Sequence, residues 1–340
     1  MTIGESIGGY RVLREFTTAG GGRCRWTFAE RSGVEFFMKE FLSPKYPVPG
    51  APGSPDTLAE KHRQCELFER RDRALMSEVN KKTAPGGNLV RTVDFFRQGT
   101  RYYKVTEKIS TSGLHVSDIA KLPPNERTLI LRTLCHSVGI LHQLNIVHGD
   151  LKPDNILISR TTASKYTTKL IDFDDSYFVG DPPGREDIVG DQAYFSPELA
   201  SYIRSDDSIN VTQLTASSDI FTLGLIFSEY LTGTFPKYDA RRYRYAWLAV
   251  LEGAPLTLRK RDTLPHIASL ISKMLASRPE ARPTIQDVFE ELKRPGGAEP
   301  APFVDPPRLR GTLVNKPPTP EPAEPSKLKG RLIEDKRRGP

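Results

Sequence analysis

Cysteine is scarce in this chain of 340 residues, which contains only Cys24, Cys65 and Cys135. They stand far apart, and neither a Cys-x-x-Cys pair nor a cysteine–histidine ligand spacing occurs. Disulfide frameworks and structural zinc sites both need such pairs, so the sequence supports neither. We therefore expect three reduced, buried thiols in a protein of the cytoplasm.

Long apolar runs and a large charge excess are missing as well. No window approaches the roughly 20 apolar residues of a membrane span, and residues 1–10 lack the basic and apolar regions of a signal peptide. The formal net charge is +7, of which residues 295–340 contribute +3 through nine Lys/Arg against six Asp/Glu. The remaining +4 does not form the clustered basic stretch of a nucleic-acid interface. We predict no membrane anchor and no nucleic-acid partner.

Proline is abundant but unevenly placed. Of the 28 prolines, 11 lie in residues 295–340 and five lie in residues 44–55. Both stretches lack the apolar residues that offset chain ordering, so they predict a disordered, basic tail (294–340) and an inserted surface loop. The tail repeats a Leu-[Arg/Lys]-Gly-x-Leu-[Val/Ile] pattern at 309–314 and 328–333. Chance similarity and a doubled docking motif for a partner protein both explain this repeat.

Hydrophobic periodicity divides the rest of the chain into two regions. The first hundred residues contain short alternating runs between glycine-bearing turns, together with one helical pattern from Cys65 to Val79. Beyond residue 110 the periods lengthen to those of helices, with two short strands among them. The expected fold class is α+β, with a small antiparallel-sheet N-lobe of one helix at about 10–107 and a larger helical C-lobe at about 110–293. The expected strands are 10–15, 25–30, 35–40, 92–97, 101–107, 156–159 and 168–172, and the expected later helices are 125–144, 217–231, 242–252, 267–277 and 285–293.

Two loops near the middle of the chain are rich in polar residues. The string His148-Gly149-Asp150-Leu151-Lys152-Pro153-Asp154-Asn155 follows an expected helix, and Asp172-Phe173-Asp174 follows a short strand. Phosphoryl transfer needs a carboxylate that accepts the proton of the attacking hydroxyl, oxygen ligands for Mg²⁺ and a cation beside the transferred group. Asp150, Asn155, Asp172 and Lys152 supply that set. Single acids in such loops more often cap turns, but the combination favours catalysis.

These strings resemble the H-R-D-x-K-x-x-N and D-F-G motifs of eukaryotic-type (Hanks-type) Ser/Thr protein kinases, and residues 10–293 are similar to a kinase domain in their order of motifs. By this resemblance Asp150 is the catalytic base, Lys152 contacts the γ-phosphate, and Asn155 and Asp172 are metal ligands. The resemblance also implies the two-lobed protein-kinase fold, the cofactors ATP and Mg²⁺, and a protein substrate.

Three residues match the family's structural supports. Glu198 ends a Ser-Pro-Glu sequence, and Arg282 of Arg-Pro-Thr matches the arginine that pairs with it, 84 residues along the chain. Asp219 matches the family's buried acid beneath the catalytic loop.

The nucleotide side of the site matches the family less closely. Lys39 resembles the strand lysine that binds the α- and β-phosphates, and the backbones of Glu107 and Ile109 resemble the hinge that meets adenine. The helix acid that should pair with Lys39 is either Asp72 or Glu69, and the apolar spacing that follows Asp72 favours that residue.

The phosphate-covering loop departs further from the family pattern. Of the three glycines of G-x-G-x-x-G only Gly22 stands in place, while Thr17 and Ala19 occupy the first two positions and Gly20 and Gly21 are added. Consecutive glycines still offer backbone N–H groups to phosphate. A flexible turn without a ligand is the alternative.

Three substitutions distinguish the chain near its catalytic motifs. Gly149 replaces the arginine that in the family answers a phosphate on the activation segment, which predicts activity without such phosphorylation. Asp174 replaces the glycine of the metal loop and should stiffen it, and Asp191 replaces a threonine on the substrate side.

Two other functions fit part of the pattern. His-Gly-Asp is common in kinases of small molecules such as aminoglycosides and choline, and the irregular glycine loop also suits a pseudokinase scaffold. The peptide-type features of the C-lobe oppose the first alternative, and the complete set of Lys39, Asp150, Asn155 and Asp172 opposes the second. The sequence favours ATP-dependent phosphorylation of Ser/Thr hydroxyls on protein substrates.

Overall fold

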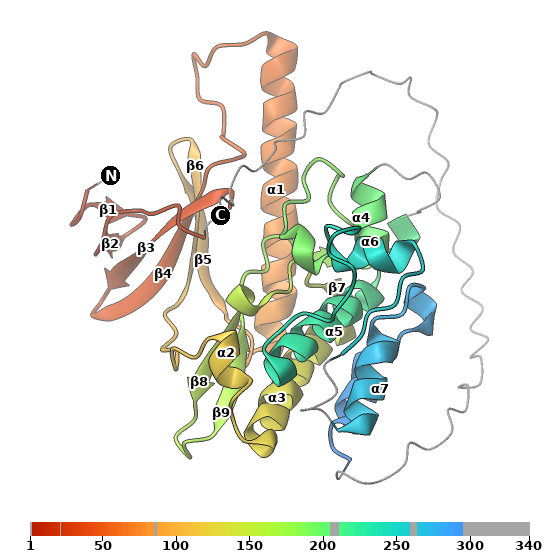
Figure 1. The fold of residues 1–340 in the computed structure, drawn as a ribbon. Helices are drawn as coiled ribbons and strands as arrows, with labels where there is room; N and C mark the ends of the chain where they lie inside the picture. The colour runs from red at the N-terminus through yellow and green to blue at the C-terminus, as the bar shows by residue number, and fades with distance from the viewer. Residues whose placement is uncertain (1, 21, 85–86, 205–210, 259–263, 295–340) are drawn as a thin grey trace. The chain divides into compact units, whose positions relative to one another are not determined.

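The computed structural model describes residues 2–20, 22–84, 87–204, 211–258 and 264–294, which belong to one compact unit, Met1–Gly296. An antiparallel sheet comes first along the chain and a mainly helical region follows (Figure 1). The expected α+β, two-lobed fold is thereby confirmed. Gly21, residues 295–340 of the expected tail and its repeats at 309–314 and 328–333 lie outside the described residues.

The N-lobe sheet has the strand order β1-β2-β3-β4-β6-β5, and all of its neighbouring strands are antiparallel. Lys39 of β4 lies directly opposite Lys104 of β6 in the register. Directly opposed residues of antiparallel strands point to the same side of a sheet, so this register places two lysines next to each other. The strands are β1 (Ser6–Ile7), β2 (Tyr10–Val12), β3 (Cys24–Arg31), β4 (Val34–Phe41), β5 (Thr92–Gln98) and β6 (Arg101–Glu107).

One long helix, α1 (Pro55–Lys82), lies beside this sheet (orange in Figure 1). It begins earlier than its hydrophobic pattern indicates, because Ser54 caps it by accepting a hydrogen bond from the Thr57 N–H. Pro55 occupies the first helical position, where the missing N–H of proline costs nothing. The inserted loop expected over 44–55 therefore ends at Ser54, and its last proline starts a helix.

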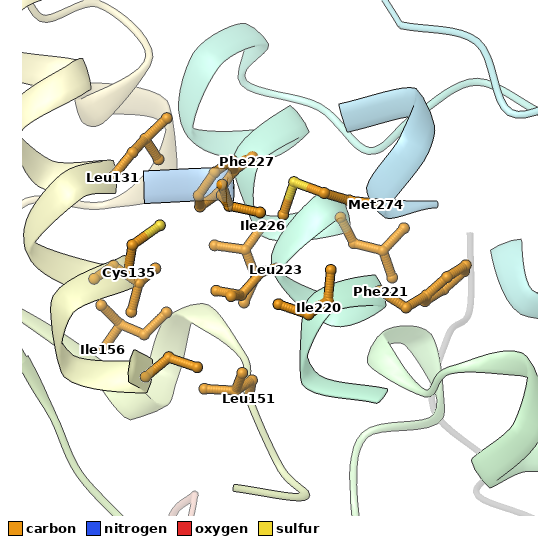
Figure 2. Close-up of a cluster of buried hydrophobic side chains, with 14 of the residues drawn as sticks. Leu131, Cys135, Leu151, Ile156, Ile220, Phe221, Leu223, Ile226, Phe227 and Met274 are labelled. Atoms are coloured by element: carbon orange, nitrogen blue, oxygen red, sulfur yellow. The ribbon is translucent and has the colours of Figure 1, made fainter. Parts of the chain in front are cut away.

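The C-lobe is built around helix α5 (Ala216–Thr232), which is buried on almost every side. Its side chains pack with those of α3 and α7 in the cluster drawn in Figure 2, where Cys135 contributes a buried thiol. An all-round apolar helix is typical of the centre of a large core. The other elements are α2 (Val116–Ile119), α3 (Pro124–Gln143), β7 (Ile146–Val147), β8 (Ile156–Arg160), β9 (Tyr166–Leu170), β10 (Tyr177–Phe178), α4 (Pro197–Ile203), α6 (Ala246–Leu251), α7 (Pro265–Met274) and α8 (Ile285–Glu291).

Besides α1, three helices differ from the sequence prediction, among them the four-residue α2, which was not expected. The helix expected over 242–252 is α6, which begins only at Ala246, because the N–H groups of Arg242 and Tyr243 donate to the Asp239 carbonyl in a separate turn. Helix α4 was not expected; Ser196 caps it, and its seven residues are too few to show a clear period.

All three cysteines are buried and unpaired, as expected. Burial raises the pKa of the Cys24 thiol to about 12, so this thiol stays protonated at neutral pH. Among the described residues, none of the helices combines the length and the apolarity that crossing a membrane requires.

Candidate active site

A buried carboxylate holds the catalytic loop from beneath. Asp219, in the first turn of α5, accepts hydrogen bonds from the backbone N–H of His148 (2.8 Å) and of Gly149 (3.3 Å). Its Oδ2 also lies 3.0 Å from Nε2 of His142 on α3. A charged acceptor with several donors fixes backbone groups strongly in a buried site. The structure thus places Asp219 beneath the backbone of His148 and Gly149, where the family resemblance predicts a buried acid.

The backbone beside Asp150 has no room for a side chain. Gly149 has a φ of +79°, in the left-handed region, and a Cβ atom on it would lie 2.6 Å from the carbonyl oxygen of Asp175. That approach is far inside van der Waals contact, so only glycine fits this backbone without a shift. The missing arginine at this position therefore follows from how closely the catalytic and metal loops pack.

Asp150 lies within a group of short hydrogen bonds. Lys152 Nζ is 2.6 Å from its Oδ2, and Asn155 Nδ2 donates to the same oxygen (3.0 Å) and to the Asp150 carbonyl (2.7 Å). Burial would lower the pKa of Lys152, but its hydrogen bond to Asp150 and the nearby charges of Asp150, Asp172 and Asp191 together outweigh burial and raise the pKa above its ordinary value. The carboxylate is therefore held in a fixed orientation beside a permanent cation, as a base that accepts a hydroxyl proton requires.

The metal loop follows β9, and Asp172 adopts a left-handed φ of +65°. Lys39 Nζ lies 2.6 Å from Oδ1 of Asp172 and 2.9 Å from Oδ2 of Asp174. Burial would lower the pKa of Lys39, but the two carboxylates raise it further than burial lowers it, so the lysine is charged. The structure brings Lys39 and Asp172 together, as a site for a phosphate chain and its metal ion needs.

The expected pairing of a helix acid with Lys39 is wrong. Asp72 forms its ion pair with Lys104, and Glu69 accepts a hydrogen bond from the Tyr102 hydroxyl (2.8 Å). The reason lies in the register: Lys104 stands opposite Lys39, and the two carboxylates of the metal loop occupy Lys39. Sequence reasoning missed Lys104, although a lysine amid the buried residues of a strand is itself unusual.

Asp175 is the third carboxylate of the metal loop, after Asp172 and Asp174. Burial, together with the charges of Asp150, Asp174 and Asp172, raises the pKa of Asp175 to about 7. Near neutral pH a large fraction of Asp175 is therefore protonated, which limits the negative charge that gathers behind the catalytic loop.

The residues of the nucleotide side lie on β3, β4 and β6 and on their connections. Gly20 and Gly22 are exposed and have left-handed φ values of +66° and +55°. Trp26 Nε1 donates to the Ala19 carbonyl (2.9 Å), which ties the base of this glycine turn to β3. Glu107 is the last residue of β6, and Ile109 follows it in the connection to the C-lobe. Their contacts with a nucleotide remain predictions.

A buried ion pair joins Glu198, in the first turn of α4, to Arg282 near the end of the domain. Arg282 donates to both oxygens of Glu198 (2.6 and 2.8 Å), and the two side chains are 0% and 3% exposed. Ser218 Oγ donates to Glu198 as well (2.7 Å). Removing either charge would leave the other unpaired in the interior, which is strongly destabilising.

The donor set around Asp172 suits a metal ion that is shared with a substrate. Among the described residues, no three Asp, Glu, His or Cys side chains form a group that could hold a metal alone. Mg²⁺ is commonly bound by one or two protein ligands together with substrate phosphates. Asn155 commits its Nδ2 to Asp150, so its amide oxygen is the atom that can join Asp172 as a ligand.

Comparison with known proteins decides the family. The sequence pattern of the family described as "Protein kinase domain" matches residues 58–292, more than half of the chain. The chain belongs to the protein kinase family. The matched range begins inside α1, so the strand of Lys39 and the glycine turn lie before it.

Three of the similar proteins are Ser/Thr protein kinases by name. The kinase is 27% identical over 304 residues to the ovarian-specific serine/threonine-protein kinase Lok of Drosophila melanogaster. This alignment covers 83% of this chain and 56% of the Drosophila protein. It is 30% identical over 165 residues to serine/threonine-protein kinase PknB of Mycobacterium leprae, and this alignment covers 47% of this chain and 24% of the relative. It is 27% identical over 244 residues to serine/threonine-protein kinase pkn2 of Myxococcus xanthus, with 67% of this chain and 28% of the relative covered. The chain thus spans between about a quarter and just over half of the length of these relatives. Membership of this family implies the use of ATP and a divalent metal ion.

The activation segment of this kinase offers no exposed hydroxyl. Between Phe173 and Ser196 there is no threonine, and the serines are 0% and 1% exposed. Each of the following four residues is buried, hydrogen-bonded or both: Ser176 donates to the His148 carbonyl (2.9 Å), Tyr177 pairs in β10, Tyr194 donates to Glu229 (2.8 Å), and Ser196 caps α4. Phosphorylation here would require the segment to open. Asp191, which replaces a threonine, caps the short helix Gln192–Tyr194 through the Ala193 N–H (2.9 Å).

Proposed function

We propose that this kinase transfers the γ-phosphoryl group of ATP, with Mg²⁺, to Ser/Thr hydroxyls of protein substrates. The observation that supports this proposal most is the Asp150 carboxylate, held by Lys152 (2.6 Å) and Asn155 (3.0 Å) in a loop joined to the metal loop. The joint is direct: the Ile171 N–H donates to the Asn155 carbonyl (3.0 Å), immediately before Asp172. This backbone hydrogen bond holds the loop of Asp150, the proposed base, close to Asp172, the proposed metal ligand.

Each residue has a distinct part in the proposed reaction. Asp150 orients the substrate hydroxyl and accepts its proton as the oxygen bonds to the γ-phosphorus and the bond to ADP breaks. Lys152 neutralises charge beside the transferred group, and Lys39 binds the α- and β-phosphates. Asn155 and Asp172 would hold Mg²⁺, which when bound would neutralise charge on the phosphate oxygens.

A substrate comparison tests this function against its alternatives. Purified kinase is incubated with MgATP and either dephosphorylated casein, an aminoglycoside or choline, and the phosphorylated product is measured. We expect phosphate on serine and threonine of casein and none on the small molecules. Phosphorylation of the aminoglycoside or choline alone would identify a small-molecule kinase, and no transfer to any acceptor would favour the pseudokinase scaffold.

Activity should not depend on phosphorylation of the activation segment. Gly149 provides no arginine to bind a phosphate, and Ser176 and Tyr177 are buried. We expect kinase from which phosphatase has removed all phosphate from residues 173–196 to keep the turnover of untreated kinase. Phosphopeptide mapping of that segment is the control. An inactive dephosphorylated kinase that regains turnover after phosphorylation at Ser176 or Tyr177 would contradict the prediction.

The partner and the location belong to the proposal as well. Residues 309–314 and 328–333 are two similar short segments that could bind one partner with raised effective concentration. A tail peptide should then retain a partner that deletion of one copy weakens, and equal recovery after deletion of both would contradict docking. The reduced cysteines fit a location in the cytoplasm.

A further inference from the structure

Lys104, which has no part in the proposed mechanism, lies at the centre of a charged cluster. Its side chain is 8% exposed, and its Nζ donates both to Asp72 of α1 and to Oδ1 of Asp174 (2.6 Å). Asp174 uses its other oxygen for Lys39 (2.9 Å). One lysine therefore bridges two carboxylates, and one carboxylate bridges two lysines.

The cluster joins three separate parts of the domain. Lys104 comes from β6, Asp72 from the middle of α1, and Asp174 from the metal loop after β9. Asp174 follows the metal ligand Asp172 by two residues, so a contact that holds Asp174 also limits where Asp172 can lie. The ion pair between α1 and the sheet is therefore formed by Lys104 of β6, the strand next to the β4 strand of Lys39.

The charges of the cluster explain why a second lysine is needed. Three carboxylates, those of Asp72, Asp172 and Asp174, face two lysines, and Asp172, 29% exposed, is the most exposed of the five side chains. Burial raises the pKa of Asp72 although Lys104 opposes the change. Without Lys104, the buried carboxylate of Asp72 and the partly buried carboxylate of Asp174 would lose a cation.

The arrangement also allows Lys39 to change partners. The proposed function requires Lys39 to bind nucleotide phosphates, which would draw it from Asp172 and Asp174. Lys104 is then the cation that remains on Asp174. The metal loop thus keeps one fixed anchor while Lys39 turns to the nucleotide.

We propose that Lys104 is a positioning residue of this kinase: it anchors helix α1 through Asp72 and the metal loop through Asp174, so that Asp172 is held in place when Lys39 binds ATP. This inference rests on the proposed function. Lys104 touches neither the phosphates nor the metal ion in this role. Its loss should lower kcat and leave the KM for ATP nearly unchanged, whereas loss of Lys39 should raise that KM.

Kinetics of matched variants test the proposal with dephosphorylated casein as acceptor. We expect Lys104→Met and Asp174→Asn each to lower kcat between about 10-fold and 100-fold, the range for a displaced catalytic group, with the KM for ATP unchanged within error. The double variant should lose no more than the worse single variant, because the two residues act as one unit. Lys81→Met is the control, since Lys81 is an exposed lysine at the end of α1 that pairs with Glu78.

Hydrogen exchange of the nucleotide-free protein provides a readout that does not depend on activity. Peptides from residues 66–76 of α1 and 171–178 of the metal loop should exchange faster in both variants, while peptides from α5 should not change. Faster exchange throughout the protein in Asp174→Asn, which keeps the shape of the side chain, would show a purely structural role and would overturn the proposal. Wild-type kcat together with wild-type exchange in both variants would overturn it as well, with the proposed function left intact. If the wild-type protein phosphorylated no acceptor, the proposed function would be contradicted. Hydrogen exchange would still test the Lys104 anchor in that case: exchange at residues 66–76 and 171–178 that is the same in the variants as in the wild type would contradict it.

Discussion

Asp150→Asn is expected to lower the turnover of the kinase by about 10²- to 10⁴-fold, the usual contribution of a positioned general base. Asparagine keeps the shape of the side chain and can still accept from Lys152 and Asn155, but it cannot take the proton of the substrate hydroxyl. The KM for ATP should change little, because the residue acts on the acceptor. Initial rates of casein phosphorylation at saturating MgATP measure the effect.

A neighbouring acid supplies the control for this variant. Asp154 is exposed and lies four residues later in the same loop, so Asp154→Asn removes a similar charge without touching the proposed base. We expect it to retain the wild-type rate. Equal losses in the two variants would indicate that only the charge of the loop matters, and an active Asp150→Asn would contradict the assignment of the base.

Asp172→Ala is expected to abolish turnover that depends on magnesium. A bound metal ion contributes several kcal/mol of charge stabilisation in such reactions, which corresponds to a loss of at least about a thousandfold. Asp172 is the one carboxylate that the family resemblance assigns to the metal, and its Oδ1 lies 2.6 Å from Lys39 Nζ. Alanine therefore removes one of the two proposed metal ligands and leaves Lys39 with Asp174.

The metal dependence of ATP binding separates this effect from misfolding. Wild-type kinase should bind ATP more tightly with Mg²⁺ than with EDTA, and Asp172→Ala should lose that difference. Asp181→Ala, at an exposed position of the same segment, should behave as wild type. Magnesium-supported turnover at the wild-type rate in Asp172→Ala would refute the metal assignment.

The sequence predicts the elements and the central residues of the site because both depend on local patterns. The alternation around Lys39 and the helical spacing of α5 arise from which face each side chain buries, and the structure contains both elements. Asp150, Asn155 and Asp172 stand in short strings whose spacing follows from the chemistry they serve. The structure brings them into two adjoining loops.

The partners of the charged residues could not be predicted in the same way. Which lysine Asp72 meets depends on the register between β4 and β6 and on the face that α1 presents, and neither is local in the sequence. The requirement for glycine at Gly149 depends on the distance to a carbonyl group 26 residues later. Asp174 could have pointed to Lys104, because it adds a carboxylate where the family has glycine. A carboxylate with little access to solvent needs a cation nearby, and Lys104 is that cation.

Mapping of phosphorylated residues by mass spectrometry, after incubation of casein with MgATP and either wild-type kinase or Asp150→Asn, tests the central claim most directly. The proposed function predicts new phosphoserine and phosphothreonine with the wild-type protein and almost none with the variant. Equal phosphorylation by both proteins, or none by either, would contradict it.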